Sequence, residues 1–189
     1  MKKFLILSFI LLPIITFADY PPIQKISDAY ISYDYNFSIK NFLKETHSPL
    51  SSMEVRGILV ADYINKECLR YNISQELVLA RIEFEQNGLT AKIKKGEWIY
   101  PSGEKAPLKS VLNRLTGYGQ IWSNAPPDHR FCKKYMGFFR QIRGCCRCYK
   151  RDWKKYHDFN LVLYNYAPKS KAVIDYNNIV KKYFPKFFN

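Results

Sequence analysis

The most constraining feature of this sequence is the spacing of apolar side chains between Lys133 and Lys155. Large apolar residues recur there at intervals of three and four: Phe139, Ile142, Cys146, Tyr149 and Trp153. This spacing places them on one face of an α-helix. The remainder of the segment is basic, with nine lysine or arginine residues and the single acid Asp152. Such a helix must bury one face against other elements, so the pattern favours a helical core.

Other segments carry helical spacing or helix-end signals. The first runs from about Met53 to the break at Tyr71-Asn72, and the second from Ser74, as an N-cap, to Asn87-Gly88. A short helix is expected after Pro107. Two more are expected from about Phe159 to Tyr166 and from Lys171 towards Phe184. Residues 33–40 alternate apolar and polar side chains, which predicts a short strand or an extended ledge. Residues 96–103 predict a hairpin or exposed loop. The fold class is therefore mainly α, with at most a small β-hairpin and no internal repeat.

Size and composition limit the class of protein. The chain has 189 residues and a mass of 22.4 kDa, enough for one domain with a hydrophobic core. Its 47% hydrophobic content excludes a disordered tail, and a mean hydropathy of −0.31 argues against a polytopic membrane protein. The formal net charge of +14 predicts a polyanionic partner without identifying it.

The N-terminus has the layout of a secretory signal. Lys2 and Lys3 precede an apolar run that ends at the small residue Ala18. A membrane anchor is the alternative, which Pro13 and the shortness of the run disfavour. We therefore expect a signal peptide at 1–18, an aromatic-rich extension of uncertain role at 19–52 and one domain at 53–189. The expected location is periplasmic or secreted, with no membrane span after signal cleavage.

Five cysteines would then meet an oxidising compartment: Cys68, Cys132, Cys145, Cys146 and Cys148. The last three share one predicted helix, where neighbouring cysteines have poor disulfide geometry. A bridge is therefore expected from Cys68 or Cys132 to one of the three, and the pairing stays open. A zinc site is the weaker alternative, because paired CxxC motifs are absent from the sequence. No metal and no cofactor is predicted.

Glu85 is the candidate for acid–base chemistry. Val78 and Ile82 precede it on nearly the same helical face, whereas Glu83 is expected to face solvent on the other side. Burial, and a place in the last turn of a helix, both favour the protonated form of a carboxyl group. Arg81, four residues earlier, favours the ionised form instead, because an ion pair with it would make Glu85 one half of an ordinary surface salt bridge. A purely structural role for Glu85 is the alternative.

Four segments together resemble one family. The run NISQELVLARIEFEQNGL resembles the helix of soluble lytic transglycosylases and goose-type lysozymes that ends at the catalytic glutamate, with Glu85 in that position. TGYGQIW is similar to the Gly-Leu-Met-Gln-Ile segment of the family, QIRGCCRCY to its Asn-Ile-x-x-Gly-x-x-Tyr-Leu helix, and LVLYNYAP to its Ala-Ala-Tyr-Asn-Ala-Gly-Pro segment. The sequence departs from the family pattern at Gln86, Asn87, Gly119, Tyr166 and Ala167.

The resemblance implies a lysozyme-like transglycosylase domain with a groove for a glycan strand. Glu85 would protonate the bond between N-acetylmuramic acid and N-acetylglucosamine, then act as base while the muramyl 6-hydroxyl closes a 1,6-anhydro ring. The resemblance also implies residues that bind substrate: Tyr118, Gln120, Ile121, Tyr164 and Asn165. A core aromatic role for Tyr164 and an exposed turn role for Gln120 are the alternatives.

Two other interpretations remain open. One is a non-catalytic peptidoglycan-binding or assembly-associated module on a degenerate lysozyme-like scaffold. The other is a binder of nucleic acid or anionic membranes through the basic helix, although no nucleic-acid motif is present and nucleic acid is not the expected partner. The expected partner is the peptidoglycan glycan strand, alongside a secretion or cell-envelope assembly. The sequence leaves open a lytic or hydrolytic product, the biological setting and the oligomeric state.

Overall fold

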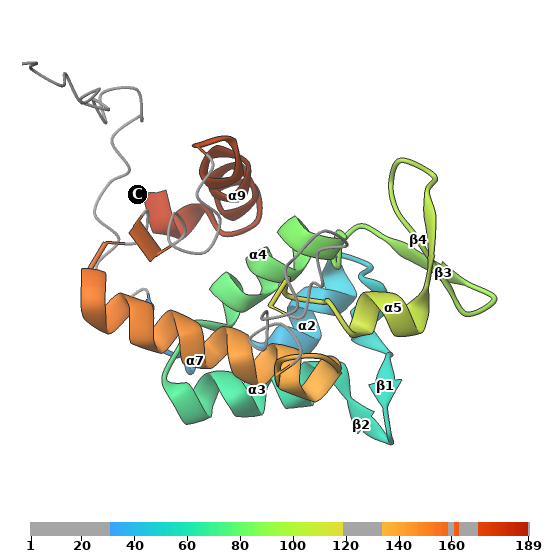
Figure 1. The fold of residues 1–189 in the computed structure, drawn as a ribbon, viewed down its shortest axis with the longest axis horizontal. Helices are drawn as coiled ribbons and strands as arrows, with labels where there is room; N and C mark the ends of the chain where they lie inside the picture. The colour runs from blue at the N-terminus through green and yellow to red at the C-terminus, as the bar shows by residue number, and fades with distance from the viewer. Residues whose placement is uncertain (1–30, 119–133, 159–160, 163–169, 189) are drawn as a thin grey trace, which may run out of the picture.

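Helices dominate the computed structural model, which describes residues 31–118, 134–158, 161–162 and 170–188 (Figure 1). Its helices are α2 (Ile39–Glu45), α3 (Val60–Tyr71), α4 (Gln75–Gln86), α5 (Leu108–Leu112), α7 (Phe138–Tyr156) and α9 (Ser170–Tyr183), with 3-10 turns at Pro49–Ser51 and Pro185–Phe188. Its strands are β1 (Glu54–Val55), β2 (Ile58–Leu59), β3 (Lys92–Lys94), β4 (Glu97–Ile99) and β5 (Lys105–Pro107). The predicted class, mainly α, is confirmed. The described residues form two small antiparallel sheets, β1-β2 and β3-β4-β5, rather than at most one hairpin.

Helix α4 lies at the centre of the core. In Figure 1 it runs between α9 on one side and α3 and α7 on the other, and it packs against all three. Ten of its twelve residues are buried, including polar ones, because neighbours cover it on every side. It begins after Ser74 and ends at Asn87, which takes a positive φ of 52°. Gly88 is required for a different reason: a Cβ there would lie 2.2 Å from Cγ2 of Ile82.

Two segments fold differently from the prediction. Residues 54–59 form the β1-β2 hairpin, so α3 begins only at Val60 and not near Met53. Arg56 and Gly57 both have positive φ, 54° and 74°, as a tight hairpin turn requires. The alternating segment at 33–40 forms no strand: residues 33–37 are irregular, and Ser38 caps helix α2 by accepting a hydrogen bond from the Asn41 amide.

Residues 31–52, which the sequence leaves without an assigned role, contribute to the same hydrophobic core as the rest of the chain. Ile31, Ile39, Leu43 and Leu50 are all buried within it. The predicted helices at α4, α5, α7 and α9 are present. The helix expected at about 159–166 falls mainly outside the described residues. None of the described helices is both long enough and apolar enough to cross a membrane.

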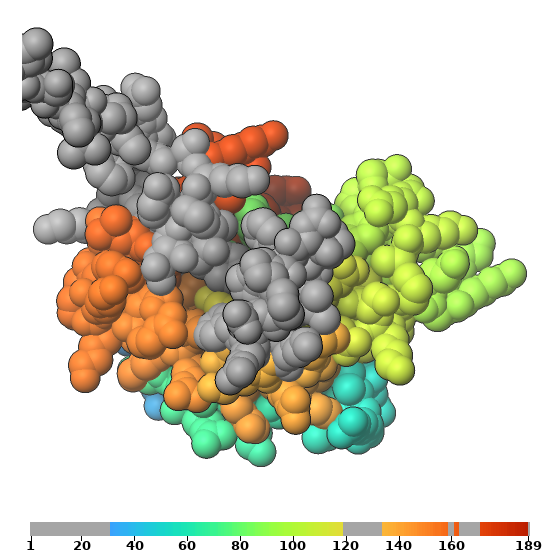
Figure 2. Space-filling model, viewed as in Figure 1, coloured from blue at the N-terminus to red at the C-terminus, as the bar shows by residue number. Residues whose placement is uncertain are grey.

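The three-stranded sheet is fixed to the C-terminal end of α4. Trp98 on β4 is fully buried, and its indole Nε1 donates a 2.8 Å hydrogen bond to the Gln86 carbonyl. The sheet otherwise projects from one side of the molecule, where its yellow-green atoms are visible in Figure 2. The buried Trp98 therefore helps to fix the position of the sheet relative to the end of α4.

A charged cluster joins the two ends of the described chain to α4. Nζ of Lys186 lies 2.7 Å from Asp34 and 2.9 Å from Glu76, whose side chain is 5% exposed. The hydrogen bond from Lys186 lowers the pKa of Asp34, whereas burial raises the pKa of Glu76 against the opposing effect of Lys186. The positive charge of Lys186 thus compensates the buried Glu76 carboxylate, whose burial without a charged partner would destabilise the fold.

We predict that Lys186→Met lowers the free energy of unfolding by about 1–2 kcal/mol at neutral pH, less than for a fully buried pair because Lys186 is partly exposed. Because the pKa of Asp34 is lowered on folding, its contribution is complete above its ordinary value of 3.8 and is lost as the pH falls through the lowered value. Burial raises the pKa of Glu76 above its ordinary value of 4.5, so the part of the difference between the two proteins that comes from Glu76 shrinks first, as the pH falls through that raised value, and the part that comes from Asp34 follows below pH 3.8. Urea unfolding measures it, with Lys181→Met, an exposed lysine on α9, as the control.

Candidate functional site

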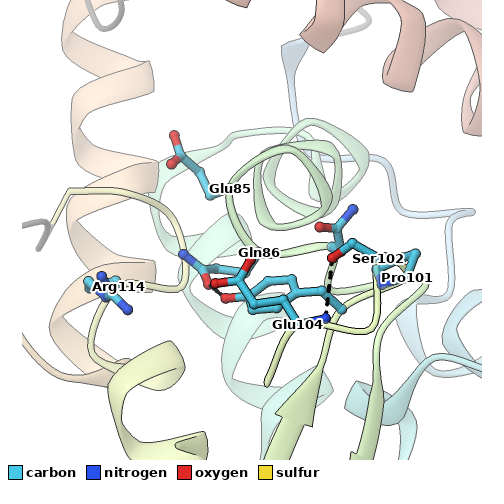
Figure 3. A pocket seen from close by; sticks show the side chains of 8 residues that line it. Glu85, Gln86, Pro101, Ser102, Glu104 and Arg114 are labelled. Atoms are coloured by element: carbon cyan, nitrogen blue, oxygen red, sulfur yellow. Dashed lines mark hydrogen bonds between the residues drawn. The ribbon is translucent and has the colours of Figure 1, made fainter. Parts of the chain in front are cut away.

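Glu85 occupies the last turn of α4, where the helix meets an open pocket of about 520 Å³. The pocket is lined by Glu85, Gln86, Asn87, Tyr100, Pro101, Ser102, Glu104 and Arg114. Figure 3 shows Glu85 projecting from α4 on the side away from Pro101 and Ser102, so its carboxylate stands at the edge of the pocket. Its side chain is only 9% exposed. The acid that the sequence singles out is therefore mostly buried and still borders open space.

Arg81 lies one helical turn before Glu85 and is buried more deeply, at 1% exposure. Its Nη1 is 4.0 Å from Oε1 of Glu85, the outer range of an ion pair. The ion pair anticipated from the sequence is thus present, but it is an interior contact and not a surface bridge. A cation so close stabilises the ionised carboxylate, whereas burial and the helix end favour the protonated form.

Three tyrosine rings surround the Arg81 guanidinium. Its central carbon lies 5.8 Å from the ring centroids of Tyr118, Tyr149 and Tyr176, a cation–π distance. We call these three residues the tyrosine cage. Burial raises the pKa of all three hydroxyls, and the charge of Arg81 opposes that rise. The cage therefore stays neutral and presents ring faces to a buried charge.

The cage is held by its own hydrogen bonds. The hydroxyls of Tyr149 and Tyr176 are 3.1 Å apart, and the Tyr176 hydroxyl donates to the Leu77 carbonyl at 2.8 Å. The segment after α5 that carries Tyr118 is held to α7 by Gln141. The Gln141 side chain accepts from the Thr116 amide at 3.2 Å and donates to the Tyr135 carbonyl. These bonds connect α4, α7, α9 and the segment after α5 around one arginine.

The hairpin side of the pocket is fixed to the same helix end. The Tyr100 hydroxyl donates a 2.6 Å hydrogen bond to Oε1 of Gln86. Gln86 is one of the positions where the chain departs from the resembled family, and here it has a structural role, since its side chain holds Tyr100 and its carbonyl holds Trp98. Tyr100, Glu104 and Arg114 are pocket residues that the sequence analysis missed, because no motif connects them to Glu85 along the chain.

The expectation that Glu83 faces solvent is wrong. Glu83 is 5% exposed, and its carboxylate accepts hydrogen bonds from the Leu89 amide at 2.7 Å and from the Thr90 hydroxyl at 2.8 Å. It therefore closes the turn after α4. Helical spacing puts Glu83 opposite Val78 and Ile82, but neighbouring elements cover that side of α4 as well, so Glu83 is buried too.

The structure places only part of the predicted site. Glu85 borders the pocket, and Tyr118 is buried at 6% exposure as a member of the tyrosine cage. Gln120, Ile121, Tyr164 and Asn165 lie outside the described residues, as does Cys132. Among the residues that the structure describes, no group of three or more His, Cys, Asp or Glu side chains could hold a metal ion.

Comparison with known proteins identifies no relative: no family model, no curated protein and no solved structure matches the chain.

We predict that Glu83→Ala lowers the free energy of unfolding by about 1–3 kcal/mol, because the buried Leu89 amide loses its acceptor. Glu83→Gln keeps one amide oxygen as acceptor and should lose less than half as much. Urea unfolding of the three proteins measures both effects. Equal stability of Glu83→Ala and wild type would contradict the structural role of Glu83.

Proposed function

We propose that the protein is an exported peptidoglycan lytic transglycosylase with Glu85 as its acid and base. The observation that carries the proposal is that Glu85 is nearly buried at the end of a central helix and borders a pocket with a β-sheet hairpin on its other side. A general acid needs a place shielded from water but open to substrate, and this position meets both needs.

The other buried carboxylates of the described chain support the choice of Glu85. Each has a structural partner away from the pocket: Glu67 with Arg143, Glu76 with Lys186, Glu83 with the Leu89 amide, and Asp152 with Arg151. Glu85 also has a charged partner, Arg81, but it differs from the others in bordering the pocket. Among the buried carboxylates of the described chain, the one that borders the pocket is therefore the one that the sequence resemblance implies.

The proposed reaction needs one carboxyl group. Protonated Glu85 gives its proton to the glycosidic oxygen, and the N-acetylglucosamine product leaves as an alcohol. The resulting carboxylate then takes the proton of the muramyl 6-hydroxyl, whose oxygen bonds to C1 and closes the anhydro ring. Glu85 ends protonated again and no water is consumed. Hydrolysis would instead require an activated water, for which the exposed Glu104 across the pocket is the available second carboxylate.

Positive charge on the protein suits this substrate. Arg114 is the basic residue among those that line the pocket. On α7 the exposed basic side chains are Arg140, Arg143, Arg147, Lys150, Arg151, Lys154 and Lys155. Muramic acid carries a carboxyl group on its lactyl ether, where stem peptides with further carboxylates attach. We assign Arg114 to a carboxylate of the bound strand and the basic face of α7 to the surrounding wall polymer.

A second candidate function is a peptidoglycan-binding module without turnover. The contact between Arg81 and Glu85 favours it, because a permanently ionised Glu85 could not donate a proton. This candidate keeps the pocket and the basic face but removes the chemistry. Export, a shared expectation of both functions, concerns residues 1–18, which lie outside the described part of the chain.

We predict that Glu85→Gln reduces cleavage of purified sacculi roughly 100-fold or more, because the amide cannot donate and accept the same proton. The matched control is Glu104→Gln on the other side of the pocket, which should retain activity. Mass spectrometry of the released fragments should find 1,6-anhydro ends. Reducing ends, together with loss of activity in Glu104→Gln, would indicate hydrolysis; binding without any cleavage by wild type would favour the non-catalytic module.

We predict that Arg114→Gln raises the KM for peptidoglycan fragments roughly tenfold, the order expected for one charged hydrogen bond. Cleavage of peptidoglycan fragments whose free carboxyl groups have been amidated should change little in the same variant, because they keep the muramyl glycan but offer Arg114 no carboxylate. Lys109→Gln, an exposed residue on the neighbouring helix α5, is the control for a general loss of charge. An equal effect of Arg114→Gln on both substrates would contradict the assignment of a carboxylate to Arg114.

A further inference from the structure

The structure brings together two cysteines that lie 78 positions apart in the sequence. Cys68 on α3 and Cys146 on α7 are both fully buried where the two helices pack, and their sulfur atoms are 3.9 Å apart. Cys145 and Cys148 are engaged elsewhere. Cys145 lies in the electrostatic surroundings of Arg81 and Glu85, and Cys148 makes hydrogen bonds to Tyr135 and Tyr118.

We propose that Cys68 and Cys146 form a disulfide that joins α3 to α7. A disulfide needs a sulfur–sulfur distance near 2.05 Å, so the two sulfur atoms must approach by about 2 Å more for the bond to form. The adjacent thiol of Cys145 projects about 100° around the helix from Cys146, so it cannot face Cys68 at the same time. The geometry therefore selects one of the pairings that the sequence leaves open.

The oxidation requires an electron acceptor, for which we name a disulfide oxidant such as oxidised glutathione or a protein thiol–disulfide oxidoreductase. Two thiols lose two protons and two electrons as the S–S bond forms, and the oxidant disulfide is reduced to two thiols. Contact with Cys68 and burial raise the pKa of the Cys146 thiol, so little thiolate exists once the chain is folded. The bond must then form during folding, before α3 and α7 close over the pair.

The bridge would enclose the candidate site. The chain between Cys68 and Cys146 contains α4 with Glu85, the β3-β4-β5 sheet and α5, that is, every residue that lines the pocket. The bridge would also anchor α7 close to Tyr149, one of the three residues of the tyrosine cage. The disulfide would thus hold the element that covers Arg81 against the rest of the core. This proposal needs an oxidising environment and does not depend on glycan cleavage.

The test is to refold the reduced, denatured full chain in a buffer of reduced and oxidised glutathione, block remaining thiols by alkylation, and digest it with trypsin without reductant. We expect a peptide containing Cys68, residues 67–70, linked to residues 144–147. That second peptide contains both Cys145 and Cys146, so Cys145→Ser must keep the link and Cys146→Ser must lose it. Persistence of the link in Cys146→Ser, or alkylation of both Cys68 and Cys146 in refolded wild type, would overturn the proposal.

Thermal unfolding provides a second measurement that does not depend on digestion. Oxidised wild type should exceed its reduced form in Tm by roughly 5–15 °C, the shift expected from a bridge that closes a long loop. Cys68→Ser should lose this difference between oxidised and reduced samples, whereas Cys148→Ser should retain it. Because each variant is compared with itself under two redox conditions, a general destabilisation by the substitution does not affect the conclusion. An equal redox shift in Cys68→Ser would contradict the pairing.

Discussion

The burial of Arg81 is the constraint around which this structure is arranged. A guanidinium with 1% exposure is tolerated only if nearby groups replace its lost hydration. Here the replacements come from separate parts of the chain: Tyr118 after α5, Tyr149 on α7 and Tyr176 on α9, together with Glu85 on the same helix. The helices therefore meet around a charge, and Glu85 is part of its compensation.

This arrangement makes the candidate site a property of the whole core. Trp98 and Tyr100 connect the sheet to Gln86, the residue next to Glu85, so the sheet is tied to the end of the helix that carries Arg81 and Glu85. Gln141 connects α7 to the segment that carries Tyr118. A change in the packing of α7 would consequently reach Glu85 through Tyr149 and Arg81. The same path explains why a bond between α3 and α7 would bear on a site that neither helix lines.

Much of the helical fold could be predicted from sequence, because α4, α7 and α9 are long and have clear helical spacing or end signals. The β1-β2 hairpin could not, since Val55, Ile58 and Leu59 are themselves spaced by three and four, and Arg56-Gly57 is not a typical hairpin turn pair. Glu85 could be singled out only by combining its place on the helix with the family resemblance, and its catalytic role stays a prediction. Arg114 and Tyr100 reach the pocket only through the tertiary fold, so no local pattern indicates them.

The choice between an enzyme and a binding scaffold depends on how strongly the surroundings of Glu85 favour its protonated or its ionised form. A reaction with one carboxyl group uses it first as an acid and then as a base, so neither a permanently protonated nor a permanently ionised group is suitable. Burial to 9% exposure and the helix end favour the acid, while Arg81 at 4.0 Å favours the carboxylate. These influences oppose each other, and the cation stands at the outer range of an ion pair. Acid–base catalysis would use both influences on Glu85, whereas a scaffold that only binds glycan would need neither.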